Sequence, residues 1–345
     1  MKESRRACIA LLLGFLAGCG GGEAAIATRA AASDTPTTMA PWNNLPPADR
    51  PIELVNLDTS DALDDDLQLP PGSTLTIAKV VEGHLHTHHW QDTGERGFYP
   101  ASTVKLITAV VLLDQLDALG VSVDGDIQLG DEPRKSIRET LVVMIRDSGN
   151  DEFNTLQESV GFAETDAWLK SVGCETGVIR RHFTRPHWNS SRPVKVWNAD
   201  GRLATELPER PGVDFPLNAA GGESNWFTTD DLVRVMAATM LGGVREKPGF
   251  DVLAESLRVS GGKFLGAQLP PRYSVYSKVG WWPPDGAYSD VAYIHDTRTD
   301  SHYFIAAYCN GPERTVEYEP AEPRQVLGTA AVQLMEMIDA GKLTF

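Results

Sequence analysis

Basic residues are scarce in this chain. It has 31 Lys and Arg against 47 Asp and Glu, for a formal net charge of -16. Because it lacks the basic excess that neutralises phosphates, we expect no nucleic-acid partner. Long apolar runs are also scarce, and the run from Ala7 to Leu16 is too short to span a bilayer as a stable helix. The hydrophobic content of 42% over 345 residues still allows one large domain or two lobes with a sizeable core.

The short apolar run follows a basic segment, Met1 to Arg6, and ends in Leu16-Ala17-Gly18-Cys19. This ending resembles the lipobox of bacterial lipoproteins, in which small residues precede the cut and a thiol carries the lipid. We therefore expect residues 1–18 to be a signal peptide. The domain would be exported and anchored to the bacterial membrane through Cys19, in the periplasm or on the cell surface. An ordinary secretory signal that contains a cysteine is the alternative.

Cysteine is the next scarce residue, with four in the chain. Cys8 would leave with the signal and Cys19 would carry the lipid. Cys174 and Cys309 remain, either as a disulfide or as two buried free thiols. Residues 19–49 are rich in Gly, Ala, Thr and Pro without any period, which predicts a flexible tether. The domain itself is expected over residues 50–345.

Strand patterns occur near both ends of the domain. Residues 73–81 and 84–90 alternate around a Glu82-Gly83 turn, and aromatic, β-branched segments follow much later, at 273–279, 288–295 and 302–309. Between them lie helical patterns at 137–145, 151–160, 164–172, 228–240 and 250–259, and a last helix is expected at 325–338. Residues 176–227 are irregular, which is typical of a functional loop.

This order predicts a mixed α+β fold. An antiparallel sheet built from both chain ends is flanked by helices, and an all-helical lobe is inserted between the two groups of strands. We expect the ligand site in the groove between the two lobes.

The strand at 84–90 carries a histidine series. His84, His86 and His88 share one face, and His89 points the other way. Three imidazoles could bind zinc, but no carboxylate or cysteine stands at ligand spacing. We therefore favour the polar outer face of an edge hairpin and expect no metal.

One stretch carries a reactive pair. Pro100 suits the entry of a helix, and the apolar run that follows contains a single cation, Lys105. Ser102 lies three residues earlier, so on a helix the two side chains share a face. Such a serine and amine form a nucleophile and a base. The four-residue pattern is weak alone, because Ser260 and Lys263 repeat it in a glycine-rich stretch. A capping serine with a surface-reaching lysine is the alternative.

Two further motifs favour the nucleophile and base over the capping serine. The set S-x-x-K, S-D-N and K-T-G marks class A β-lactamases and penicillin-binding proteins. Here the set reads Ser102-Thr103-Val104-Lys105, then Ser148-Gly149-Asn150, then Lys278-Val279-Gly280. From about Thr74 to the C-terminus, the chain resembles this superfamily of penicillin-recognising serine hydrolases, and class A β-lactamases most. Lys247-Pro248-Gly249 also matches K-x-G, but it lies in a charged turn.

The resemblance implies a serine hydrolase that acts on a β-lactam or a related amide, through an acyl-enzyme and without metal or cofactor. Ser102 would attack the carbonyl, Lys105 would take its proton, and Ser148 would relay a proton to the leaving nitrogen. Substrate-binding roles fall on Asn150, Lys278, Gly280 and Trp281, and the N–H groups of Ser102 and Trp281 would form the oxyanion hole. A small-molecule or peptidoglycan-like substrate and a monomer are expected.

The sequence departs from the class A pattern at three points. Gly149 replaces the aspartate of the second motif, and Val279 replaces a hydroxyl residue that binds the substrate carboxylate. The third departure is an absence. Class A enzymes use a glutamate to activate the deacylating water, but residues 176–199 contain no Asp or Glu. His182 or His187 could act as a substitute base, or be surface histidines. Four acidic residues could also fold back into the site: Glu206, Glu209, Asp214 and Glu223.

These departures keep two other functions open. One is a penicillin-binding, D,D-peptidase-like or esterase activity with slow deacylation. The other is a catalytically degenerate lipoprotein that only binds a ligand.

Overall fold

The computed structural model describes residues 52–57, 67, 69–90, 97–183, 189–216, 224–243, 247–260, 263–282, 286–310 and 321–345. The predicted signal peptide, the tether and Cys19 lie outside these ranges, so export and lipid anchoring stay predictions of the sequence. Within the ranges, no helix combines the length and apolar character needed to cross a membrane.

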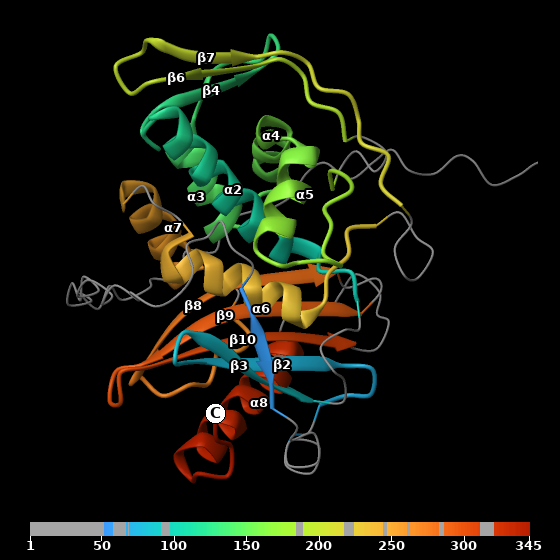
Figure 1. Ribbon diagram of the computed structural model, residues 1–345, viewed down its shortest axis with the longest axis vertical. Helices are drawn as coiled ribbons and strands as arrows, with labels where there is room; N and C mark the ends of the chain where they lie inside the picture. The colour runs from blue at the N-terminus through green and yellow to red at the C-terminus, as the bar shows by residue number, and fades with distance from the viewer. Residues whose placement is uncertain are drawn as a thin grey trace, which may run out of the picture. The chain divides into compact units, whose positions relative to one another are not determined.

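A six-stranded sheet is built from both ends of the described chain (Figure 1). Its strand order is β1-β3-β2-β10-β9-β8. Every neighbouring pair is antiparallel except β1 with β3. The strands are β1 (Leu54–Asn56), β2 (Thr74–Val81), β3 (His84–Trp90), β8 (Tyr273–Trp282), β9 (Ala287–Asp296) and β10 (Ser301–Asn310). The predicted sheet is confirmed, because its alternating β-branched and aromatic segments form these strands.

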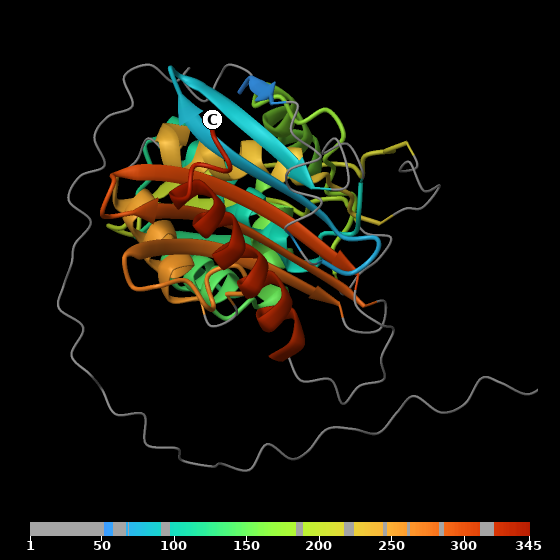
Figure 2. The same cartoon turned by 90° about the horizontal axis from the view of Figure 1, so that it is seen from below.

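Helices cover both faces of the sheet. α8 (Ala321–Asp339) runs diagonally across one face, where Leu327 and Leu334 meet Ile77, Ile294 and Ile305 in a buried cluster (Figure 2). On the other face lie α6 (Thr229–Ala238) and α7 (Lys247–Val259). α6 continues into a short π-helical turn, Thr239–Gly243.

The predicted cap of α6 also fastens this helix to the sheet. The Thr228 side chain accepts from the Asp231 N–H, and the Asp231 carboxylate accepts from the Thr228 N–H, which forms a capping box. In the first turn, Asp230 accepts hydrogen bonds from Thr76 at 3.0 Å and from His89 at 2.9 Å. Because Thr76 and His89 belong to β2 and β3, these bonds fix the helix on the sheet.

The inserted lobe is built around α2 (Val104–Leu119), which is apolar on nearly every side and therefore buried. α3 (Ile137–Arg146), α4 (Asn150–Val160) and α5 (Phe162–Ser171) complete its helices. A 3₁₀ turn, η1 (Ala101–Thr103), leads into α2.

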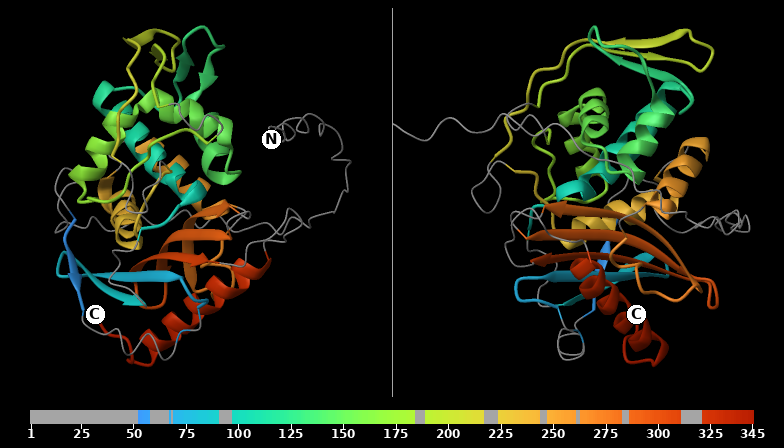
Figure 3. Two further views of the ribbon diagram at one scale, coloured as in Figure 1. Left: turned by 90° about the vertical axis from the view of Figure 1, so that its right-hand side faces the viewer. Right: turned by 180° about the vertical axis from the view of Figure 1, so that it is seen from behind.

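The expectation that this lobe is all-helical is wrong. A small sheet of order β5-β4-β6-β7 caps it (Figure 3), formed by β4 (Asp126–Leu129), β5 (Lys135–Ser136), β6 (Val194–Trp197) and β7 (Leu203–Leu207). The stretch 176–227, expected to be irregular, thus contains two strands. β7 lies largely exposed at the edge, so its sequence carries no buried alternating face that would mark it as a strand.

Two open questions from the sequence are answered by burial and contacts. Cys174 and Cys309 are both buried and are not joined by a disulfide. The β2–β3 hairpin does not form the edge of the sheet as expected, because β1 pairs with the outer edge of β3. His88 is buried, 2.7 Å from the Thr344 carbonyl oxygen, whereas His84 lies 3.7 Å from Glu53.

Candidate active site

Ser102 and Lys105 stand side by side at the start of α2. Ser102 lies in η1, after Ala101, whose φ of 48° places it in the left-handed region. Lys105 follows one helical turn later and is fully buried, with its Nζ 3.0 Å from Ser102 Oγ. The surface-reaching lysine of the alternative interpretation is therefore excluded.

The second motif lies against the same amine. Lys105 Nζ donates to Asn150 Oδ1 at 2.7 Å, and it also bonds the Ser148 carbonyl oxygen and, at 3.2 Å, Ser148 Oγ. Ser148 has a φ of 60° between α3 and α4. This left-handed turn brings the backbone oxygen and the hydroxyl of one residue to the same nitrogen.

The charge of Lys105 is strongly affected by its surroundings. Burial, followed by the positive charge of Lys278, lowers the pKa of Lys105 to about 6, and Glu152 opposes the shift. At pH 7 most of the amine is therefore neutral. A neutral amine carries the lone pair that a base needs.

The third motif reaches the site from the sheet. Lys278 on β8 is buried, and its Nζ donates to Ser148 Oγ at 3.0 Å and to the Val279 carbonyl oxygen at 2.9 Å. Burial lowers the pKa of Lys278 to about 8, with Asp290 opposing. Ser148 Oγ is thus held between the amines of Lys105 and Lys278 and links the helical lobe to the sheet.

Gly280 allows β8 to approach η1 closely. A Cβ at this position would lie 2.0 Å from the Pro100 carbonyl oxygen and 3.0 Å from the Ser102 backbone nitrogen. Ser289 on β9 holds the same turn by donating to the Pro100 oxygen at 2.7 Å. Trp281, the next residue on this edge strand, is 40% exposed. Only glycine at 280 therefore permits the approach that an oxyanion hole between Ser102 and Trp281 would need.

Val279 points away from this chemistry. Side chains alternate along β8, so Lys278 and Gly280 face η1 and Val279 faces the opposite side of the sheet. There it packs, partly buried, against the α8 core cluster.

The chain after α5 brings a phenyl ring to the buried amine. The Phe183 ring centroid lies 5.2 Å from Lys105 Nζ, and the ring packs on Phe153 at 4.6 Å. Asn154 Oδ1 accepts from the Phe183 N–H at 3.1 Å. No motif marks Phe183, and sequence reasoning missed it.

The substitute bases considered from the sequence lie elsewhere or outside the described residues. His182 is buried, with its ring edge-on to Phe162 at 5.0 Å. Glu206 pairs with Lys195 at 3.6 Å, and Glu209 and Asp214 are exposed. His187 and Glu223 fall outside the described residues. Among the described candidates, none contacts Ser102 or Lys105 in place of the missing glutamate.

Gly149 lies under the Glu152 carboxylate, so a side chain at this position would displace that flexible group. A Cβ there would lie 2.0 Å from Glu152 Oε2 and 3.1 Å from Val143 Cγ1. The Glu152 carboxylate packs over Gly149 in the first turn of α4, and its charge acts on Lys105. Sequence reasoning missed Glu152, although its place one turn after Ser148 was a usable signal.

The two-lobed fold and the three motifs meeting at one buried amine define the class of penicillin-recognising serine hydrolases. The chain belongs to the β-lactamase enzyme family, whose family model matches residues 79–336. No curated protein sequence matches it.

Solved structures resemble the fold at low sequence identity. A class A β-lactamase from Mycobacterium abscessus matches with a TM-score of 0.58 and 16% identity, over 81% of this chain and 97% of that one. One from Bacteroides cellulosilyticus matches with a TM-score of 0.57 and 17% identity, over 78% and 92%. The TLA-1 extended-spectrum β-lactamase matches with a TM-score of 0.60 and 15% identity, over 81% and 99%. These likenesses support a class A β-lactamase-like fold.

Proposed function

We propose that this protein is a serine hydrolase that forms an acyl-enzyme on Ser102 with a β-lactam or a related amide. One observation carries the proposal. Lys105 Nζ lies 3.0 Å from Ser102 Oγ, and its pKa is lowered to about 6, so a neutral base stands beside the hydroxyl at pH 7.

Acylation then follows the hydrogen bonds of the site. Lys105 takes the proton as Ser102 Oγ bonds to the carbonyl carbon, and the oxyanion is bound by the N–H groups of Ser102 and Trp281. When the C–N bond breaks, Ser148 gives its proton to the leaving nitrogen and recovers one from Lys105. Ser148 Oγ lies 3.2 Å from Lys105 Nζ, which suits this relay. Asn150 holds Lys105 in place through the bond at 2.7 Å.

Substrate charge is the second element of the proposal. Lys278 places a buried positive charge beside Ser148, which favours an anionic substrate and a neutral Lys105. Position 279 offers a substrate carboxylate no contact, because Val279 has no hydroxyl and its side chain packs against the α8 core cluster. We therefore propose that ordinary penicillins are poor substrates compared with amides that rely less on that contact.

One observation favours slow deacylation as a second candidate function. Among the described residues of the loop after α5, the one that lies beside Lys105 is Phe183, an apolar ring that cannot activate water. The acyl-enzyme would then persist, as in a penicillin-binding protein, a D,D-peptidase-like enzyme or an esterase of altered substrate.

Intact-protein mass spectrometry tests both candidates. The full-length chain is mixed separately with a penicillin, a cephalosporin and a general serine-hydrolase probe, with Ser102→Ala as the control. We expect a mass increase that Ser102→Ala abolishes. The lifetime of a β-lactam adduct separates turnover from penicillin-binding behaviour.

Two results would change the proposal. An adduct with the probe but with neither β-lactam would indicate another acyl substrate. Unmodified protein with all three reagents would contradict an enzyme and leave a degenerate binding lipoprotein.

A further inference from the structure

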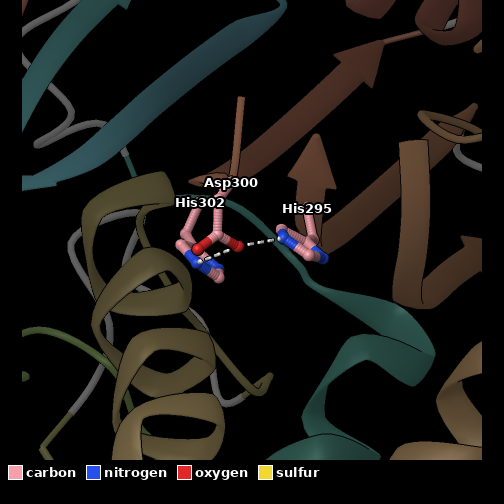
Figure 4. Close-up of side chains that lie close together, drawn as sticks. All are labelled: His295, Asp300 and His302. Atoms are coloured by element: carbon pink, nitrogen blue, oxygen red, sulfur yellow. Dashed lines mark hydrogen bonds and ion pairs between the residues drawn. The ribbon is translucent and has the colours of Figure 1, made fainter. Parts of the chain in front are cut away.

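The β9–β10 hairpin brings two histidines and an aspartate together (Figure 4). His295 on β9 and His302 on β10 are cross-strand partners, and their rings stack with centroids 4.6 Å apart and planes 6° apart. Asp300 lies just before β10 with a φ of 54°. Its Oδ1 is 2.8 Å from His295 Nε2 and 3.7 Å from His302 Nε2. One carboxylate oxygen therefore faces an imidazole nitrogen from each strand.

These distances are close to those of a metal site. The three ligand atoms all lie within 4.8 Å of one another. In tetrahedral zinc sites, metal–ligand distances of about 2.0–2.1 Å place neighbouring ligand atoms roughly 3.3 Å apart. The observed 2.8 and 3.7 Å fall on either side of that separation. His295 and Asp300 have side chains that are 28% and 83% exposed, so they are free to rotate the short distance required.

The ring of His302 is already oriented by a hydrogen bond at Nδ1, as the rings of metal-ligating histidines are. Its Nδ1 lies 2.6 Å from the hydroxyl oxygen of Tyr293, a buried residue. When Nδ1–H donates to that oxygen, the lone pair is on Nε2, the nitrogen that faces Asp300.

The cluster is separate from the serine site. Ser289, which touches the η1 turn, lies six residues before His295 on β9, roughly 20 Å along the strand. It also differs from the histidine series on β3, where the sequence favoured a polar face over a zinc site. There His84 contacts Glu53, whereas His88 packs against Thr344 and Phe345 at the other end of the chain.

We propose that His295, Asp300 and His302 form a zinc-binding site that clamps the β9–β10 hairpin. Two imidazole nitrogens and one carboxylate are a donor set that zinc prefers, and water completes the tetrahedron from the solvent side. Because the ion joins two strands and their turn, it stabilises the folded chain.

Zinc titration of the full-length chain tests the site. After treatment with a chelator, isothermal titration calorimetry with zinc chloride should give one ion per chain with a dissociation constant on the order of micromolar. His295→Gln and Asp300→Asn should each weaken binding about 100-fold or more. Tyr293→Phe, which removes only the partner of Nδ1, should weaken it about 10-fold. The matched control His84→Gln, on β3, should bind zinc like the wild type.

A second readout is independent of calorimetry. Zinc should raise the melting temperature of the wild type and of His84→Gln, but not that of His295→Gln. Absence of zinc binding by the wild type would overturn the proposal. Binding of equal strength by His295→Gln and the wild type would overturn it too.

Discussion

At the scale of single residues, the proposed chemistry depends on the charge of Lys105. Its side chain is fully buried and bonds Ser102, Ser148 and Asn150. The sequence indicated the pair because a lone cation in an apolar helix is costly unless it is used or paired. The position of Glu152 one turn after Ser148 was a weaker signal and was overlooked; its carboxylate packs over Gly149 and partly opposes the lowered pKa of Lys105.

The rate of acylation should depend on pH through Lys105. Its pKa is lowered to about 6, so the neutral base becomes more abundant as pH rises through that value. We expect the rate constant for adduct formation to rise between about pH 5 and 7. Lys105→Ala should lower it by about 10²–10⁴-fold and remove this limb. Time-resolved mass spectrometry across pH measures both effects. A rising limb that persists in Lys105→Ala would assign the base to another group.

At the scale of elements, the site depends on how closely β8 approaches η1 and on what the loop after α5 places beside Lys105. The three motifs predicted which elements meet. Nothing in the sequence predicted Phe183 beside Lys105, because the path of an irregular segment is set by tertiary contacts such as the bond from the Phe183 N–H to Asn154. β7 was hidden by its lack of a buried alternating face, and β6 is only four residues long.

Gly280→Ala should separate β8 from η1. The new Cβ would lie 2.0 Å from the Pro100 carbonyl oxygen, a backbone atom that cannot turn aside. We expect a loss of about 3 kcal/mol or more in the free energy of unfolding and loss of the Ser102 adduct. Urea denaturation and mass spectrometry measure the two. The control is Gly120→Ala, where nothing lies within 4 Å and the φ of 65° alone should cost about 1 kcal/mol. Equal losses in both variants would contradict the close approach.

Phe183→Glu should speed deacylation. The variant places a carboxylate beside Lys105, where the phenyl ring now lies 5.2 Å from Nζ. Such a group can activate water, so the lifetime of a β-lactam adduct should shorten about tenfold or more. Loss of the packing on Phe153 should cost about 2–4 kcal/mol of stability. Phe183→Gln is the control, because it loses the same packing without gaining a base. A similar shortening in Phe183→Gln would show that access of water, not a base, limits deacylation.

At the scale of the whole molecule, the sequence predicted the large sheet and the inserted helices because their patterns are local and regular. It could not predict features that arise only when distant segments meet. Asp290 is one of these, a carboxylate with no motif around it that folding buries completely. It accepts from the N–H groups of Phe264 at 3.0 Å and Leu265 at 2.9 Å, and so joins β9 to a segment before β8.

The free energy of unfolding should depend on pH through the titration of Asp290. Burial raises its pKa from 3.8 to about 6, which the two backbone N–H groups, Lys278 and Lys263 only partly offset. The folded state therefore holds this proton more tightly than the unfolded state. The resulting stabilisation is complete below about pH 4 and is lost as pH rises through about 6. Its upper bound is about 3 kcal/mol.

Asp290→Asn isolates this contribution, because its amide oxygen still accepts both N–H groups but does not titrate. We expect the stability difference, wild type minus Asp290→Asn, to fall as pH rises from about 4 to 7, measured by urea denaturation of the full-length chain. Glu255→Gln is a control of opposite sign. The bond to Arg258 holds the pKa of Glu255 below its usual value. The stability difference, wild type minus Glu255→Gln, should therefore rise with pH, by less than about 1 kcal/mol for this exposed pair. A flat profile for Asp290→Asn would mean that this carboxylate stays ionised in the folded chain because Lys278 and Lys263 compensate its burial.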